Sequence, residues 1–280
     1  MSNHLESEAP QTLEGWYALH DAYTVDWPHW YRLKQSERDQ AIQAATAWLE
    51  LADTQDHGHS AAYSLLTQKG DLLFIHYRPQ PEDLNHEELA LRQTTLFEYL
   101  RPAYSFLSVI EIGLYELTAI VLRKLADQSI TPESPQYSEL FQTEMSKQRT
   151  RVETRLFPAI PDKRYLCFYP MSKRRGEQVN WYTLPINERR DLMRGHGRIG
   201  HKYHEEVIQA IGGAIGLDDW EWGVSLFADD MLLFKKLIHE LRFDPASARY
   251  AEFGPFYLGI RLPTAQFSAF LAGNLKQFTQ

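Results

Sequence analysis

The order in which strand-like and helix-like segments follow one another constrains the fold of this chain more than any other feature. The spacing of apolar residues predicts a strand, a helix, a two-strand hairpin, a second helix and a final strand in the first half. These segments are residues 12–25, 26–53, 61–67, 71–77, 81–100 and 104–115. The β-α-β-β-α-β order is that of a ferredoxin-like unit.

A second series follows in a similar order, which indicates a duplicated unit although the two halves share little sequence. Residues 164–171, 219–226 and 251–261 have strand character, 229–242 is helical, and 187–215 is predicted to be helical with breaks. The strand at 219–226 has no clear hairpin partner. Two such sheets can face each other as a barrel with the helices outside. We therefore predict an α+β fold in which two fused ferredoxin-like units form a dimeric α+β barrel.

The same pattern predicts how the chain is divided. A polar tail at 1–10 is expected to be disordered, and an N-terminal ferredoxin-like unit covers 11–118. A proline-containing connection with one helix covers 119–162, and a C-terminal ferredoxin-like unit covers 163–280. We expect the C-terminal unit to carry the functional site.

Charge is unevenly distributed along the chain. The net charge is −8, which argues against general nucleic-acid binding. Yet residues 147–202 contain 14 Lys and Arg against 5 Asp and Glu, whereas the rest contains 15 basic and 32 acidic residues. A basic segment in an acidic protein suggests a site for a polyanionic small molecule. The alternative is that these charges point to several unrelated faces.

One cysteine, Cys167, excludes an internal disulfide and a cysteine-based zinc or iron–sulfur site. It lies in an apolar run, so we expect a buried small residue rather than a nucleophile. The sequence has no apolar run of membrane-spanning length and no signal-peptide pattern, so a cytoplasmic location is the default expectation.

Three runs in the second half contain the residues that could carry chemistry: 169–182, 193–200 and 216–223. In the second run His196 stands between Gly195 and Gly197, and the missing side chains would let a flat macrocycle approach the imidazole. A neutral imidazole nitrogen is a good ligand for a porphyrin iron. The alternative is an ordinary surface or capping histidine.

In the first run Tyr169 ends a predicted strand close to Lys173. A tyrosine can lose one electron and become a radical, and a nearby cation would hold a substrate carboxylate against it. Without further information, a strand-end core tyrosine is the more common case. Met171 would lie near a ring edge or pack in the core, and Trp181 could pack on a porphyrin or in the core.

Taken together, these runs resemble the C-terminal half of the coproheme decarboxylases of the chlorite dismutase superfamily. The resemblance covers roughly residues 100–262, and it extends to the N-terminal half only through element order. By resemblance, His196 matches the proximal iron ligand, Tyr169 the redox tyrosine and Lys173 a propionate-binding lysine. Arg155 and Ser247 match propionate-binding positions. Met171 and Gln209 complete the implied binding site.

The resemblance implies a reaction and a setting. Hydrogen peroxide would drive oxidative decarboxylation of two propionates of Fe-coproporphyrin III (coproheme) to vinyl groups, giving haem b and two CO2. The intermediate would carry three propionates, and coproheme would be both substrate and redox centre, with Tyr169 acting as a radical. The family commonly forms homopentamers, and transient contact with the coproporphyrin ferrochelatase is a further expectation.

Two details of the site depart from a simple match. The first is His201, which stands where the family often has Arg. His201 and His204 could share a helix face, but no third zinc ligand is evident, so we expect both to be structural. His196 and Gln209 are 13 residues apart, which is ~20 Å along a straight helix. Since the resemblance implies that they flank one iron, we expect the helix to break between them, at 195–200, unless Gln209 is not distal.

Three other functions are compatible with parts of this pattern. A chlorite dismutase or peroxidase would keep haem b, but an uncharged Gln209 cannot supply the positive charge that stabilises an oxyanion. A haem carrier or sensor would need no redox tyrosine beside Lys173. An unrelated ferredoxin-like interaction domain would leave the basic segment unexplained.

Overall fold

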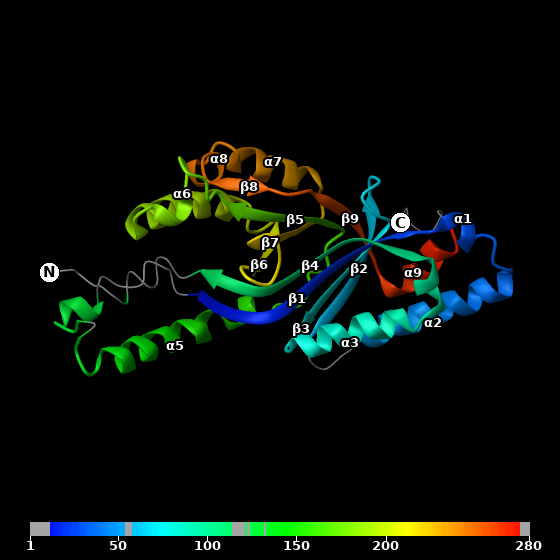
Figure 1. The fold of residues 1–280 in the computed structure, drawn as a ribbon, viewed down its shortest axis with the longest axis horizontal. Helices are drawn as coiled ribbons and strands as arrows, with labels where there is room; N and C mark the ends of the chain where they lie inside the picture. The colour runs from blue at the N-terminus through cyan, green and yellow to red at the C-terminus, as the bar shows by residue number, and fades with distance from the viewer. Residues whose placement is uncertain (1–11, 54–57, 114–120, 122–123, 132, 275–280) are drawn as a thin grey trace.

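The computed structural model describes residues 12–53, 58–113, 121, 124–131 and 133–274. Its centre is an antiparallel sheet whose strands close into a ring, with helices packed on the outside (Figure 1). The predicted disordered tail at 1–10 lies outside the described residues. No helix in the described ranges is long and apolar enough to cross a membrane.

The first half of the chain forms one ferredoxin-like sheet with strand order β4-β1-β3-β2. Its elements are β1 (Thr12–Val25), α1 (Trp27–Trp30), α2 (Gln35–Asp53), β2 (His59–Leu66), β3 (Leu72–Arg78), α3 (Pro81–Arg92), the 3-10 helix η1 (Thr95–Tyr99) and β4 (Leu100–Gly113). The helix expected in the connection is α5 (Tyr137–Leu156).

The second half forms a matching sheet with strand order β6-β7-β5-β9, and β8 extends it beside the end of β5. Its elements are β5 (Tyr165–Lys173), the 3-10 helix η2 (Trp181–Thr183), α6 (Ile186–Lys202), β6 (Ile208–Gly213), β7 (Trp222–Ala228), α7 (Leu232–Leu241), α8 (Pro245–Ala248), β8 (Ala251–Phe253), β9 (Tyr257–Leu262) and α9 (Thr264–Leu271). The predicted α+β fold of two ferredoxin-like units is confirmed.

The two sheets join along both edges. β2 pairs with β9 from Ala62–Leu262 to Leu66–Leu258, and β4 pairs with β6 at Val109–Gly213 and Ile110–Gly212. Closure leaves no free edge among these eight strands. The inward side chains, including Tyr63, Phe106, Phe168 and Phe227, fill the interior.

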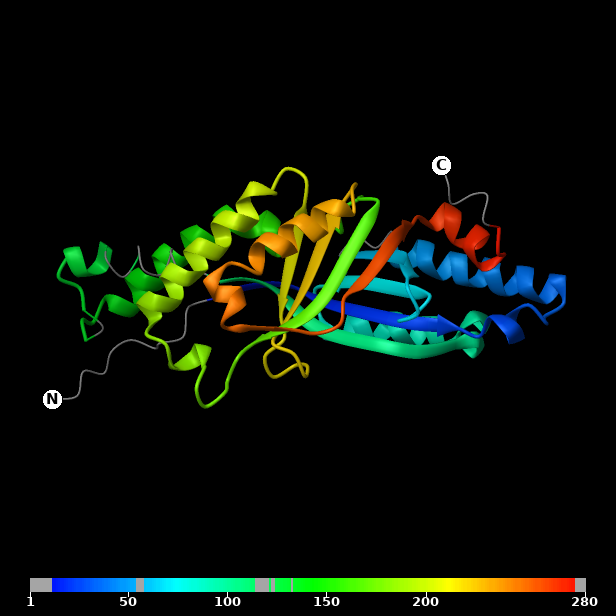
Figure 2. The same cartoon turned by 90° about the horizontal axis from the view of Figure 1, so that it is seen from above.

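Helices cover the outer face of each sheet. Aromatic and aliphatic residues of α2 and η1 pack on the first sheet, and α9 returns from the end of the chain to join them (Figure 2). The Trp30 indole nitrogen donates to the Leu271 carbonyl at 2.8 Å, which ties α1 to α9. On the second sheet, α7 buries Leu233, Phe234 and Leu237.

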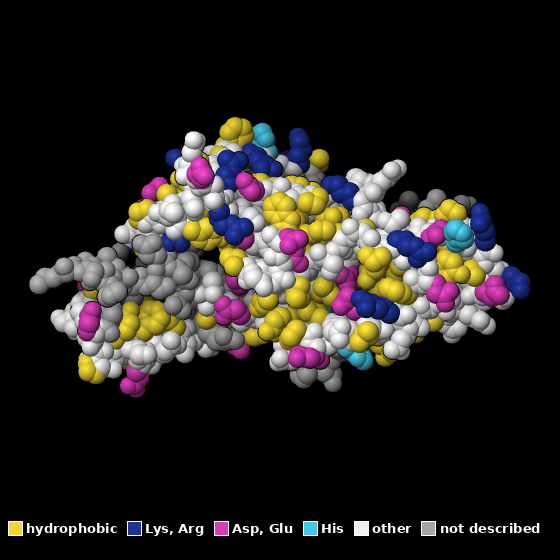
Figure 3. All heavy atoms as spheres, viewed as in Figure 1, with side chains coloured by type: hydrophobic (Ala, Val, Ile, Leu, Met, Phe, Trp, Pro, Cys, Tyr) yellow, Lys and Arg dark blue, Asp and Glu magenta, His cyan; other side chains and the backbone are white. Residues whose placement is uncertain are grey.

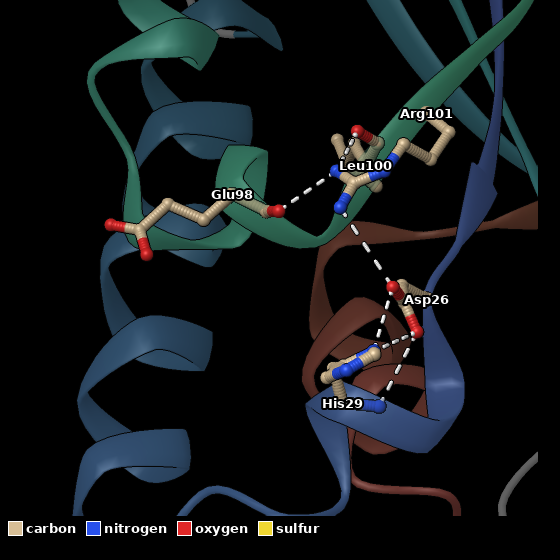
Figure 4. Close-up of polar contacts among 5 residues, drawn as sticks. All are labelled: Asp26, His29, Glu98, Leu100 and Arg101. Atoms are coloured by element: carbon tan, nitrogen blue, oxygen red, sulfur yellow. Dashed lines mark hydrogen bonds and ion pairs between the residues drawn. The ribbon is translucent and has the colours of Figure 1, made fainter.

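The predicted helix over 26–53 is interrupted at residues 31–34, after a first turn that is capped by Asp26. Its carboxylate accepts hydrogen bonds from the backbone nitrogen and Nδ1 of His29 and so caps α1, a preferred role for Asp at a helix start. Arg101 lies 3.8 Å from the same carboxylate and donates to the Glu98 carbonyl (Figure 4). The helix therefore begins as a single turn and restarts as α2.

The predicted helix over 187–215 is wrong in its second part. α6 ends at Lys202, and residues 208–213 form β6, which pairs with β7 in the register Gln209–Leu226. β6 is thus the hairpin partner that the sequence did not reveal. The glycines at 195, 197 and 200 lie inside α6, so the expected break occurs after them rather than at them.

Two buried histidines make the fold sensitive to acid. His20 stacks on Phe168 at 4.2 Å inside the barrel and bonds to the Ser225 hydroxyl at 2.9 Å, while His76 bonds to Ser60 at 2.8 Å under α2. Burial lowers the pKa of each imidazole to about 3. The unfolded chain therefore binds more protons than the folded chain between about pH 6.5 and 3.

We expect the free energy of unfolding to fall as the pH drops below about 6.5, since each pKa unit corresponds to about 1.4 kcal/mol. Asp21, whose pKa burial raises to about 6, opposes part of this loss below pH 6. Urea unfolding at about pH 7.5 and about pH 5 measures the effect. The His20→Asn variant should lose less stability than the parent between these two conditions; an equal loss would contradict the assignment to His20.

Candidate functional site

Three predicted site residues share one face of β5 because side chains alternate along a strand. Tyr169, Met171 and Lys173 point to the helix-covered outer face, whereas Phe168 points into the barrel. The Tyr169 ring is buried between Phe256 at 4.6 Å and Phe253 at 5.8 Å. Burial raises the pKa of its hydroxyl, so the residue stays protonated at neutral pH.

Lys173 is buried at the end of β5, with 8% of the residue exposed. Its ammonium lies 4.2 Å above the ring of Trp181 and donates to the Ala246 carbonyl at 3.3 Å. Burial lowers the pKa of Lys173 to about 8, although the charges of Asp244 and Glu221 act in the opposite direction. Trp181 is itself fully buried, so it packs in the core.

His196 is held through one ring nitrogen. Its Nδ1 lies 2.8 Å from the Asp244 carboxylate and 3.3 Å from the Ser247 hydroxyl. Burial alone would raise the pKa of Asp244, but hydrogen bonds and charge from His196 and Ser247 lower it. An ionised Asp244 accepts a hydrogen bond from Nδ1–H, and this tautomer leaves the Nε2 lone pair for a ligand.

Asp244 occupies this position because it caps α8. Its carboxylate accepts from the Ser247 backbone nitrogen at 3.2 Å, and its side chain is 1% exposed, against 32% for His196. A buried carboxylate behind a half-exposed imidazole is the usual arrangement behind a metal-binding histidine. The short helix α8 therefore brings Asp244, Ser247 and the Ala246 carbonyl together, between His196 and Lys173.

The surface of α6 next to His196 is open. A Cβ added at Gly197 would meet nothing within 4 Å, and one at Gly200 would meet the Gln209 amide nitrogen at 3.4 Å. Gln209 thus faces α6 from β6, one helical turn beyond His196. The structure brings these two residues to the same side of the second sheet.

An apolar face lies uncovered between α6 and the sheet. Ile211 points outward from β6 and is 41% exposed, and on the same face the opposed pair Trp222 and Met171 is half-buried. The apolar residues Leu192, Met193 and Ile199 of α6 are also only half-buried, although a surface helix normally buries its apolar stripe. These half-buried side chains leave an apolar surface on which a ligand could pack.

A hollow of about 570 Å³ lies between the first half of α6 and α8. It reaches Asp244 and Gly195, but Glu188 and Asp191 contribute to its wall. These carboxylates disfavour an anionic ligand, so the open face toward β6 and β7 is the better candidate for one.

The remaining predicted residues have different surroundings. Arg155 is exposed near the end of α5, and within the described ranges it has no hydrogen bond or ion pair with the other site residues. His201 and His204 stack at 4.3 Å on the surface, and the described part of the chain holds no cluster of three or more His, Cys, Asp or Glu side chains placed to bind a metal ion. Cys167 is buried as expected, and burial raises the pKa of its thiol to about 12.

Sequence reasoning missed Asp244 and Arg242. The Arg242 guanidinium lies 3.9 Å above the Phe253 ring, and its charge acts to lower the pKa of Tyr169. Both residues lie in the stretch between α7 and α8, where no motif marks them. Only the contact of Asp244 with His196 and the packing of Arg242 on Phe253, a neighbour of Tyr169, reveal them.

Comparison with known proteins places this architecture. The family model for chlorite dismutase matches residues 38–262. A haem-binding protein from Thermus thermophilus is 40% identical, with a TM-score of 0.80 over 95% of this chain and 99% of that one. A chlorite dismutase variant from Candidatus Nitrospira defluvii is 19% identical, with a TM-score of 0.70 over 92% and 96% of the two chains. The chain therefore belongs to the chlorite dismutase family.

Proposed function

We propose that this protein is a peroxide-dependent coproheme decarboxylase, which converts Fe-coproporphyrin III into haem b with release of two CO2. The observation that carries the proposal is the grouping of three functions on one face of the second sheet. The His196–Asp244 pair offers an iron ligand, Tyr169 offers a redox group, and Lys173 offers a cation for a carboxylate.

The residues present suit an iron porphyrin. Bound iron porphyrin would supply the oxidising chemistry with hydrogen peroxide, and the protein would bind and orient it. His196 would bind the iron through Nε2, with Asp244 fixing the ring orientation. The half-buried apolar residues of α6 and β6 would pack on the macrocycle, and Gln209 would contribute an uncharged amide from β6.

The propionate carboxylates of coproheme require cationic side chains to bind them. Ser247 contacts His196, and Lys173 donates to Ala246 on the same short helix. Arg242 packs on Phe253, which in turn packs on Tyr169, so charge-assisted hydrogen bonds could hold carboxylates near both groups. Figure 3 shows further Lys and Arg side chains gathered over α6, α7 and α8. We include the exposed Arg155 of α5 as a propionate-binding residue by its resemblance to such a position.

Tyr169 would act as the oxidant of the propionate. Its radical would take a hydrogen atom from the propionate side chain, which restores the phenol. Loss of CO2 and one further electron would leave the vinyl group, so each propionate would give up two electrons, the number that one peroxide accepts. Burial of Tyr169 between Phe253 and Phe256 would keep its radical away from solvent.

A second candidate function is haem binding without turnover. It is favoured by the Thermus thermophilus protein, which was identified as a haem-binding protein. A chlorite-converting function is less favoured because Gln209 carries no positive charge for an oxyanion. Together with the decarboxylase function, we propose that the protein forms a homopentamer, is cytoplasmic and makes transient contact with the coproporphyrin ferrochelatase.

Product mass separates these functions. Purified protein is mixed with ferric coproheme, peroxide is added, and the porphyrins are analysed by mass spectrometry. We expect haem b after loss of two CO2, and a three-propionate intermediate at early times. Unchanged coproheme would overturn the decarboxylase and favour a carrier.

The Tyr169→Phe variant should bind coproheme with unchanged affinity yet form no haem b, because Phe cannot supply the phenolic hydrogen. Tyr165→Phe is the matched control, since Tyr165 lies on the same strand and face. Titration of the Soret band measures binding, and mass spectrometry measures turnover. Normal turnover by Tyr169→Phe would remove the radical role of this residue.

A further inference from the structure

A tryptophan on the sheet below α6 is bonded to a carboxylate. The Trp222 indole nitrogen donates to Glu111 Oε1 at 2.8 Å. Trp222 begins β7 in the second half of the chain, whereas Glu111 comes from β4 in the first half, 111 residues away. The contact therefore bridges the two ferredoxin-like units.

Gly213 makes this contact possible. It lies on β6 directly opposite Trp222, and a Cβ added there would overlap the Glu111 carboxylate. The Glu111 side chain thus crosses the backbone of β6 through the space that glycine leaves. Burial raises the pKa of Glu111, and the Trp222 hydrogen bond acts in the opposite direction.

Strand register places Trp222 at the candidate site. It pairs with Met171, and directly opposed residues of an antiparallel pair lie on the same face of the sheet. Tyr169 lies on that face two residues before Met171. Trp222 is half-buried next to Ile211, so it contributes to the uncovered apolar surface that faces α6.

We propose that Trp222 is a second one-electron donor of this site and that Glu111 is its proton acceptor. The inference rests on the proposed function for its oxidant, the porphyrin after reaction with peroxide. One electron leaves the indole for that oxidant, and the indole N–H proton moves to the carboxylate. The products are a neutral tryptophan radical and a neutral carboxylic acid, and return of an electron from Tyr169 or an external reductant reverses both transfers.

The other tryptophan contacts lack this chemistry. Trp16 and Trp30 donate to the backbone carbonyls of Pro158 and Leu271, which cannot take up a proton. Trp181 lies under the Lys173 ammonium, whose charge disfavours an oxidised ring. Among the tryptophan hydrogen bonds found in the described ranges, that of Trp222 alone ends on a carboxylate.

Electron paramagnetic resonance tests the proposal. Protein loaded with ferric coproheme is mixed with peroxide and frozen rapidly, with ring-deuterated tryptophan used to identify tryptophan radicals. The Tyr169→Phe background removes the competing tyrosine. We expect a tryptophan signal in this background, its loss when Trp222→Phe is added, and a weaker, shorter-lived signal when Glu111→Gln is added.

Trp16→Phe in the same background is the matched control and should leave the signal intact. A tryptophan signal that survives Trp222→Phe would overturn the role of Trp222. A signal of equal yield and lifetime with Glu111→Gln would overturn the role of Glu111. Product mass in the parent protein separates the two proposals. If haem b forms but no Trp222-dependent radical is seen, only the proposal that Trp222 is an electron donor is refuted. If a Trp222-dependent radical forms without haem b, the donor role is supported and the decarboxylase function is refuted.

Discussion

The His196→Ala variant is expected to lose the spectrum of a histidine-bound iron porphyrin and nearly all peroxide-dependent turnover. The physical reason is that its Nε2 is the ring nitrogen left for a ligand once Asp244 binds Nδ1 at 2.8 Å. Removing an outer partner of a metal ligand typically costs about 10- to 100-fold in affinity or activity, which is the loss expected for Asp244→Asn. Removing the ligand itself should lower affinity and activity by more than about 100-fold.

Optical and resonance Raman spectra of the coproheme-loaded variants measure the ligation directly. Free imidazole should restore the histidine-type spectrum in His196→Ala, because the side chain has been removed from an open helix surface beside Gly197. His204→Ala serves as the matched control, since the contacts found for this surface histidine in the described ranges are with His201. A histidine-bound spectrum that persists in His196→Ala but disappears in His204→Ala would refute the site.

The Glu87→Ala variant is expected to lower the free energy of unfolding by about 3–5 kcal/mol, because it leaves a buried guanidinium without its counter-charge. Arg78 is completely buried, and its Nη2 lies 2.9 Å from Glu87 Oε1. The same guanidinium donates to the carbonyls of Ala52, His59 and Tyr77. It therefore joins the end of α2 to α3 and to strands β2 and β3.

Urea unfolding followed by circular dichroism measures this loss. The double variant Arg78→Leu/Glu87→Leu should be less destabilised than Glu87→Ala, since apolar residues of similar volume remove the buried charge together with its partner. Arg92→Ala is the control for a surface ion pair, because Arg92 and Glu88 are partly exposed and such pairs contribute at most about 1 kcal/mol. A change below that value for Glu87→Ala would contradict the argument.

Local sequence patterns were sufficient where an element's own residues decide its structure. β1 has the bounds that its apolar pattern predicts, and the repeated element order predicts both ferredoxin-like units. The prediction failed at 208–213, where an apolar stretch follows a real helix. Its pairing with β7 and β4 is a contact between distant segments, and such pairings override local helical spacing.

The candidate site also combines features that the sequence predicts with features that only the tertiary structure reveals. His196, Tyr169 and Lys173 stand in recognisable runs, and strand alternation alone predicts that Tyr169, Met171 and Lys173 share a face. By contrast, Asp244 reaches His196 across 48 residues, and Glu111 reaches Trp222 across 111. The sequence by itself therefore determined the repeated unit and the chemical groups at the site. Only the tertiary structure decided their partners and protonation, because closure of the barrel and the packing of α8 against α6 set which charges are buried together.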